Sequence, residues 1–162
     1  MTSPNPFGTL LYLMTVVWAM GLKIMPLSTV IQPWNPDWVL LVMIYWFLAL
    51  PYRCGVFSAW MIGILTDVLT GRMLGQYALI YAVISYICLK LYKRIRLFPL
   101  LQQGAFIFFC LLFAQILAFC IESIHNPSRF EFAFLFPAFS GTLVWPFVGV
   151  ILRIIRVRNR VG

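Results

Sequence analysis

The chain is divided into six apolar stretches, and the short turns between them hold most of its charges. The first stretch is uncharged from Phe7 to Leu22, and another has no charge between Cys54 and Thr66. Such stretches suit α-helices that cross a bilayer, because a helix satisfies its own backbone hydrogen bonds away from water. We therefore expect six transmembrane helices, at residues 7–25, 38–51, 55–71, 74–92, 99–121 and 132–155.

The composition supports a membrane protein. Of the 162 residues, 63% are hydrophobic and 10% are charged, against about 45–50% and about 25% in soluble domains. A soluble domain of this length cannot bury so much apolar surface. We predict an all-α integral membrane protein in which residues 1–162 form a single domain, since no loop is long enough to fold alone.

The distribution of basic residues predicts the topology. The formal net charge is +8, from 12 Lys+Arg and 4 Asp+Glu. Six spans place both termini on one side. If that side is the cytoplasm, nine basic residues lie inside and three, Lys23, Arg72 and Arg129, lie outside. Because positively charged loops stay inside, we expect cytoplasmic N- and C-termini in a multi-pass protein.

The basic residues also bear on possible partners. Those between Lys90 and Arg96 are interpreted as a solvated charge run at the cytoplasmic face. Contact with membrane lipids, including anionic head groups, is expected. No basic run alternates with aromatic residues in the manner of an RNA-binding surface, so we expect no nucleic-acid partner.

The sequence offers no constellation typical of an enzyme. The four cysteines are scattered, and His125 is the single histidine, without a partner at metal-ligand spacing. No nucleophile–base pair, phosphate-binding loop or pair of acids at general acid–base spacing is present. We expect no catalytic residues, no metal and no cofactor. The N-terminus lacks a basic n-region and a cleavage site, so the first apolar stretch is expected to remain in the mature protein.

The stretch Trp60–Gly75, W-M-I-G-I-L-T-D-V-L-T-G-R-M-L-G, places an acid inside an apolar segment. Helical spacing puts Gly63, Asp67 and Gly71 on one face, where glycines allow another backbone to approach closely. A carboxylate at such depth should face protein or water rather than lipid. The face is either a packing surface with one hydrogen-bonded acid or a substrate or proton site. One ionisable group favours packing.

Candidate partners for Asp67 come from the helix that follows it. The hydroxyl groups of Tyr77, Tyr81 and Ser85 and the side chain of Gln76 are candidate hydrogen-bond partners of its carboxylate, with Tyr81 or Gln76 as the first choice. Without such a partner the carboxylate should be protonated or in contact with water. If only these hydrogen bonds matter, the nearly isosteric change Asp67→Asn should be tolerated. If the group carries protons or substrate, the same change should fold normally and fail in function.

The remaining polar residues are expected near the membrane interfaces. Lys23 should extend to the interface at the end of the first helix. Pro36 and Asp37 suit the start of the second helix, with the acid in its first turn. Trp38 suits the interface itself, and Pro51 should end this helix.

These motifs resemble those of a bacterial family, the rod shape-determining protein MreD. The resemblance rests on P-W-N-P-D-W-V-L-L-V-M-I-Y-W at 33–46, A-L-P at 49–51 and G-I-L-T-D-V-L-T-G-R-M-L-G at 63–75. It extends to Gln102-Gln103, Glu122 and L-V-W-P at 143–146. The candidate structural and partner-packing residues are Pro36, Trp38, Pro51, Gly63, Asp67, Gly71, Gly75 and Glu122.

The resemblance implies a non-enzymatic scaffold in the bacterial inner membrane, within the machinery that elongates the cell wall. It implies direct binding to MreC, and action alongside MreB, RodA and penicillin-binding protein 2. It also implies a fold like that of the substrate-binding membrane subunits of vitamin (ECF-type) transporters, which have six helices and a cavity. Such a cavity, with a buried Asp67, leaves a small transport or ligand-binding subunit as the alternative function.

Overall fold

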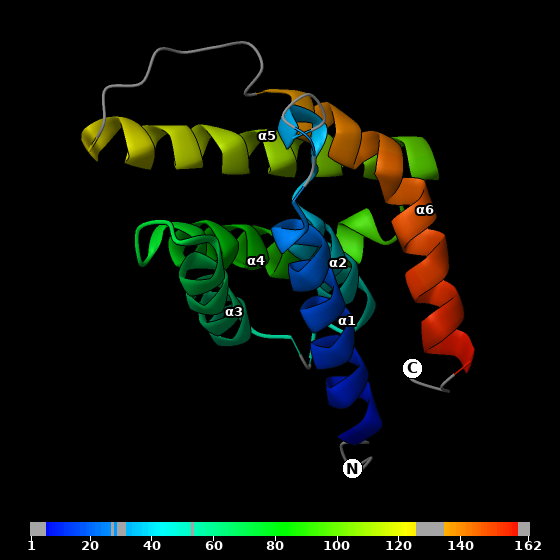
Figure 1. The fold of residues 1–162 in the computed structure, drawn as a ribbon. Helices are drawn as coiled ribbons and strands as arrows, with labels where there is room; N and C mark the ends of the chain where they lie inside the picture. Colours follow the sequence, from blue (N-terminus) through cyan, green and yellow to red (C-terminus); the bar gives the residue numbers. More distant parts are fainter. Residues whose placement is uncertain (1–5, 27, 29–31, 53, 126–134, 159–162) are drawn as a thin grey trace.

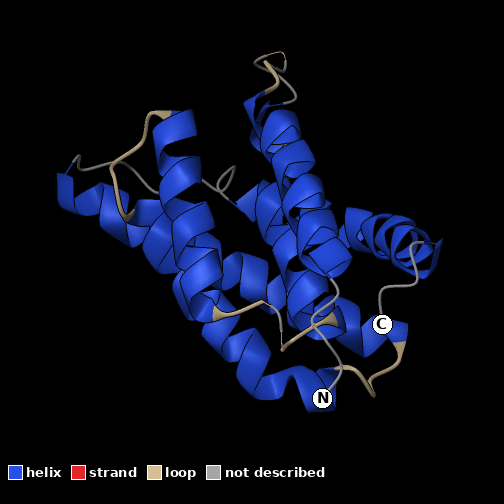
Figure 2. Ribbon diagram, turned by 90° about the horizontal axis from the view of Figure 1, so that it is seen from below, coloured by secondary structure: helices blue, strands red, loops and turns tan. Residues whose placement is uncertain are grey.

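The structure is a computed structural model, and it describes residues 6–26, 28, 32–52, 54–125 and 135–158. All regular structure in these residues is helical (Figures 1 and 2). The six α-helices and one short 3₁₀-helix are α1 (Pro6–Ile24), η1 (Gln32–Trp34), α2 (Trp38–Ala49), α3 (Val56–Thr70), α4 (Gln76–Ile95), α5 (Leu100–His125) and α6 (Phe136–Arg158).

The number of α-helices agrees with the prediction, and their ends differ from it. The last helix was expected to start at residue 132, which lies outside the described residues. In the structure α6 begins at Phe136. α5 continues to His125, beyond the predicted end at 121, because no proline or glycine stands between residues 105 and 125. η1 was not predicted, and it occupies part of the proline-rich linker before α2.

α2 forms the centre of the molecule. Nine of its 12 residues are buried, on all sides of the helix, and it packs against α1, α4 and α6. A helix that is apolar all round is stable only when it is surrounded. At about 1.5 Å per residue it is about 18 Å long, less than the roughly 30 Å bilayer core. Its neighbours, rather than lipid, therefore cover it.

The contact between α1 and α2 combines apolar and polar groups. Tyr12 is buried against the indole of Trp46 in an edge-to-face arrangement, with ring centroids 6.2 Å apart. The indole nitrogen of Trp46 donates a hydrogen bond of 2.9 Å to the hydroxyl of Thr15. This bond satisfies a donor that would otherwise be buried without a partner.

The other helices form two pairs around α2. α3 and α4 form a closely packed hairpin, and α5 packs against both α4 and α6. In Figure 1, α4 and α5 run across the view, one above the other, while α1 and α6 run down it. Figure 2 shows the same helices from below.

The exterior of this arrangement is apolar. Trp18, Phe109 and Leu143 are 76%, 65% and 76% exposed, and many other large apolar side chains share this environment. Two helical stretches, Gln102–Ile124 and Phe136–Arg158, are long and apolar enough to cross a membrane. Because contiguous apolar surface of this extent is unfavourable in water, it indicates a membrane protein.

Candidate functional site

The helices α3 and α4 approach each other closely at Gly63. A Cβ atom at this residue would lie 2.6 Å from the backbone nitrogen of Ala78 and 2.7 Å from the carbonyl oxygen of Tyr77, and closer still to the Cα of Ala78. These neighbours are backbone atoms, which cannot rotate away. Glycine at this position therefore allows the backbones of α3 and α4 to touch.

Asp67 lies one turn further along α3 and is fully buried. Its Oδ1 accepts a hydrogen bond of 2.8 Å from the backbone N–H of Tyr77. Its Oδ2 accepts bonds of 2.9 Å from the N–H of Gly75 and 3.3 Å from the N–H of Ala78. These three amides belong to the first turn of α4, where a helix leaves its N–H groups without internal partners.

Asp67 thus caps a helix other than its own. Gly75, the residue before α4, has no side chain that could serve as the usual N-terminal cap. The remaining amide of this turn, on Gln76, donates to the carbonyl oxygen of Met73 at 3.2 Å. All four leading N–H groups of α4 are therefore satisfied. The positive end of the helix dipole also favours a carboxylate at this position.

The prediction that Tyr81 or Gln76 holds the Asp67 carboxylate was wrong. Gln76 donates instead to the carbonyl oxygen of Ala118 in α5, at 3.3 Å. Tyr81 faces a different acid, described below. The expectation that Asp67→Asn is tolerated depended on these partners. An amide offers one oxygen to three backbone donors, so it can keep two of the three bonds at best.

Gly71 was predicted to share the packing face of Gly63, and the structure places it elsewhere. It follows the last residue of α3 with φ of +64°, and a Cβ there would meet nothing within 4 Å. Its N–H and that of Arg72 both bond to the carbonyl oxygen of Asp67, which ends the helix. Gly75 also has a positive φ, of 102°. Both glycines therefore serve the turn rather than the packing face.

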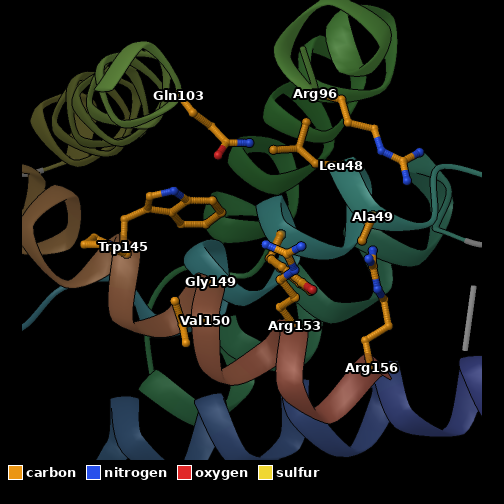
Figure 3. A pocket seen from close by; sticks show the side chains of 11 residues that line it. Leu48, Ala49, Arg96, Gln103, Trp145, Gly149, Val150, Arg153 and Arg156 are labelled. Carbon is orange, nitrogen blue, oxygen red and sulfur yellow. The ribbon is translucent and has the colours of Figure 1, made fainter. Parts of the chain in front are cut away.

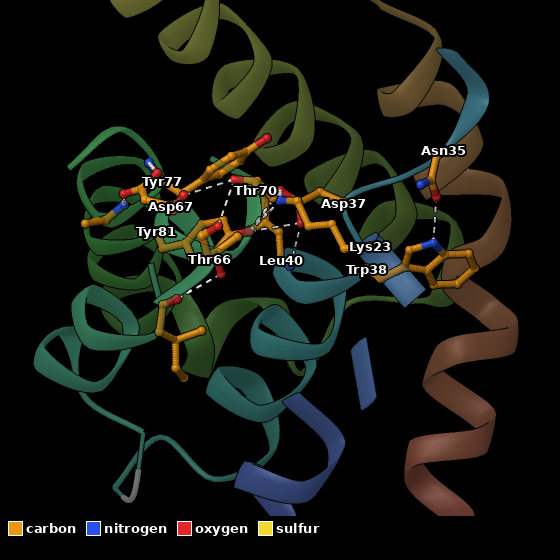
Figure 4. A network of polar contacts seen from close by, with 12 residues as sticks. Lys23, Asn35, Asp37, Trp38, Leu40, Thr66, Asp67, Thr70, Tyr77 and Tyr81 are labelled. Carbon is orange, nitrogen blue, oxygen red and sulfur yellow. Dashed lines mark hydrogen bonds and ion pairs between the residues drawn. The ribbon is translucent and has the colours of Figure 1, made fainter. Parts of the chain in front are cut away.

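A second carboxylate, Asp37, lies at the start of α2. It is the residue before the helix rather than one in its first turn, and its Oδ1 accepts a bond of 3.3 Å from the N–H of Leu40. The ammonium group of Lys23 lies 3.0 Å from its Oδ2. The hydroxyl of Tyr81 lies 3.0 Å from both carboxylate oxygens and accepts a bond of 3.0 Å from Lys23 (Figure 4).

Lys23 was predicted to extend to the membrane interface, and the structure instead places its side chain among residues of three helices. Its side chain is 12% exposed and that of Asp37 is 13% exposed. The ammonium group lies over the ring of Tyr77, 3.6 Å from the centroid, in a cation–π contact. An ion pair removed from water is favourable only when further hydrogen bonds surround it, and Tyr81 supplies them here. This cluster joins α1, α2 and α4.

The other candidate residues occupy supporting positions. Pro36 is buried next to Gly141, whose added Cβ would lie 3.5 Å from its ring. Trp38 begins α2, and its indole nitrogen donates to the side chain of Asn35 at 2.8 Å. Pro51 lies in the turn after α2. Glu122 forms an exposed ion pair of 3.3 Å with Arg72, a kind of contact worth about 0–1 kcal/mol.

A cavity of about 550 Å³ adjoins the Asp37 site, and Asp67 is not among the residues that line it. It is polar on several sides, and its walls come from α1, α2, α5 and the α3–α4 hairpin. Its polar lining includes Lys23, Asp37, Thr70, Arg72, Tyr77 and Gln115. A cavity of this size with convergent polar groups has the dimensions of a small-ligand site.

Sequence reasoning missed the Lys23–Asp37–Tyr81 cluster. Lys23 and Asp37 stand on either side of a proline-rich linker, and Tyr81 is far away in the chain. The available signal was a lysine near the end of an apolar segment with an acid at the start of the next. Two opposite charges at adjoining helix ends can meet when the linker folds back.

Comparison with known proteins identifies the family to which the chain belongs. The family model described as rod shape-determining protein MreD matches residues 5–155. The rod shape-determining protein MreD of Haemophilus influenzae is 29% identical over 138 residues, which cover 85% of this chain and 85% of that protein. No solved structure matches the chain. The chain therefore belongs to the MreD family of rod shape-determining proteins.

Proposed function

We propose that this chain is a non-enzymatic scaffold of the bacterial inner membrane that binds MreC directly. In this role it acts with MreB, RodA and penicillin-binding protein 2 to control cell shape and lateral peptidoglycan synthesis. Family membership supports a role in rod shape. The observation that supports the scaffold role is that Asp67 accepts all three of its hydrogen bonds from backbone N–H groups at the start of α4. Such a carboxylate holds two helices together and has no free oxygen directed at a reactant.

The proposed topology has six spans with both termini in the cytoplasm. The excess of basic residues on that side, nine against three, supports it. Reporter fusions after Gly162 and within residues 126–129 should report opposite sides of the membrane. Reporters on the same side would overturn the six-span topology.

Co-purification from detergent-solubilised bacterial membranes tests the scaffold. MreC should remain bound to the wild-type chain, and a chain that retains MreC should restore rod shape to cells that lack their own MreD. Failure to retain MreC, in a protein that accumulates and folds normally, would contradict the proposal.

The second candidate is a small transport or ligand-binding subunit, as in the substrate-binding subunits of vitamin transporters. The polar cavity of about 550 Å³ favours it. Mass spectrometry of the purified protein under native conditions decides between the two. A retained small molecule, or a co-purifying transporter ATPase module, would support the ligand-binding subunit.

A further inference from the structure

A second cavity, of about 400 Å³, lies at the other end of α2, where α6 carries its arginines (Figure 3). Arg96, at the end of α4, lines it together with Arg153 and Arg156, one turn apart on α6. In Figure 3 the side chains of these three residues extend into the same space from α4 and from α6. We call this cavity the arginine pocket.

None of the described residues that line the arginine pocket is acidic. Three of the four acids in the chain lie in the described residues, and all three have partners elsewhere. Asp37 pairs with Lys23, Glu122 pairs with Arg72, and Asp67 accepts bonds from backbone amides. Three guanidinium groups that face one space repel each other, and an anion between them would relieve that repulsion.

Tyr45 adds a hydrogen-bonding group to the arginine pocket. It also lines the cavity, and its hydroxyl is buried with no hydrogen-bond partner among the described residues. Arg153 and Arg156 lie within electrostatic range of this hydroxyl. Buried hydroxyl groups are nearly always paired, so an unpaired one beside two cations indicates that a ligand acceptor completes the site.

The walls identify the class of anion. Trp145, Val150 and Leu48 are apolar side chains that line the same cavity. Arg153 and Arg156 stand near the end of α6, a helix that is long and apolar enough to cross a membrane. Phosphate head groups and acyl chains meet at that level of a bilayer, and arginine binds phosphate through paired N–H groups. A free anion would gain nothing from the apolar side chains, whereas a phospholipid can place its phosphate at the arginines and an acyl chain against the apolar residues.

We propose that the arginine pocket binds the phosphate group of an anionic phospholipid, with Arg96, Arg153, Arg156 and Tyr45 as its donors. The lipid stands between α2, α4 and α6 and neutralises the three arginines that line this cavity. The proposal rests on membrane insertion and does not depend on MreC binding.

Native mass spectrometry of the full-length protein in detergent tests the site, with added phosphatidylglycerol and, separately, phosphatidylethanolamine. The wild-type chain should prefer phosphatidylglycerol. The double variant Arg153→Gln/Arg156→Gln should weaken that binding about tenfold or more, because charge-assisted hydrogen bonds are lost. Tyr45→Phe should weaken it by a smaller factor of about two to five, since one neutral hydrogen bond is lost.

The matched control is Lys93→Gln/Arg158→Gln, which removes the same charge from residues that do not line the cavity. It should leave phosphatidylglycerol binding unchanged. An equal loss in the control and the test variant would overturn the site, as would equal binding of the two lipids. Glycerol 3-phosphate serves as the soluble probe. If it binds through the same arginines while phosphatidylglycerol does not, the lipid assignment is wrong.

Discussion

Asp37 and Asp67 both cap the start of a helix, yet the molecule neutralises them in different ways. Asp37 precedes its own helix, α2, and meets the ammonium group of Lys23 and the hydroxyl of Tyr81. Asp67 reaches from α3 to the start of α4 and meets backbone amides. Side-chain partners can be exchanged by mutation, whereas backbone partners cannot. The two carboxylates should therefore respond differently to substitution.

The largest effect is expected at Asp67. Asp67→Leu leaves the N–H groups of Tyr77 and Ala78 without acceptors inside the hairpin, at about 1–3 kcal/mol for each. We expect a loss of roughly 3 kcal/mol or more in the free energy of unfolding in detergent. The neighbouring control Val68→Leu, on a side chain that is 61% exposed, should be neutral. A stable Asp67→Leu protein would show that the cap is dispensable.

The close approach of the helix backbones at Gly63 predicts the next effect. Gly63→Ala should destabilise the hairpin by about 1–3 kcal/mol, because the added atom meets backbone. Gly104→Ala in α5 is the matched control, since its added atom meets nothing within 4 Å. It should be neutral or stabilising by up to about 1 kcal/mol. Equal unfolding temperatures for both variants would mean that α3 and α4 do not touch at Gly63.

Substitutions of Lys23 and Asp37 should have coupled effects on the free energy of unfolding, because both partners are side chains. The backbone partners of Asp67 allow no such test. Asp37→Asn and Lys23→Met should each destabilise the protein, because each leaves a charged partner partly buried. The double variant should recover about 1 kcal/mol relative to the sum of the single effects. Unfolding free energies of the four proteins provide this cycle. Additive single effects would indicate that the two side chains do not interact.

The smallest effect is expected at the turn. Gly71→Ala introduces a side chain at φ of +64°, which costs about 1–2 kcal/mol for an L-residue without local hydrogen bonding. Gly71→Asn should cost less, since asparagine tolerates this conformation better than alanine. A larger cost for asparagine than for alanine would point to crowding, as on a packing face, and against a conformational role.

Helical periodicity predicted the parts of the site that depend on one helix. The spacing of Gly63 and Asp67 indicated a face that another backbone could approach. The cost of a charge in an apolar segment predicted that Asp67 faces protein or water rather than lipid, and the structure places it in protein. Periodicity failed at Gly71 because it treats the helix as continuous, whereas α3 ends one residue earlier. The donors to Asp67 are backbone N–H groups, which every residue except proline carries, so the sequence does not single them out. Their signal is Gly75, which starts a helix without a cap of its own.

Contacts between distant segments could not be predicted in this way. Asp37 meets Tyr81, and Arg96 shares a cavity with Arg153, only after α2, α4 and α6 have packed together. The apolar segments specify that these helices form, and they leave open which polar ends become neighbours. The polar clusters therefore emerge from tertiary packing.

Amide hydrogen exchange in Asp67→Asn tests the account most directly. The central claim is that the Asp67 carboxylate holds the first turn of α4. Relative to wild type, the N–H of Tyr77 or of Ala78 should exchange about tenfold faster or more, the change that corresponds to about 1.4 kcal/mol. The N–H of Leu40, which Asp37 caps, should be unchanged. Unaltered protection at Gly75, Tyr77 and Ala78 in the variant would contradict the claim.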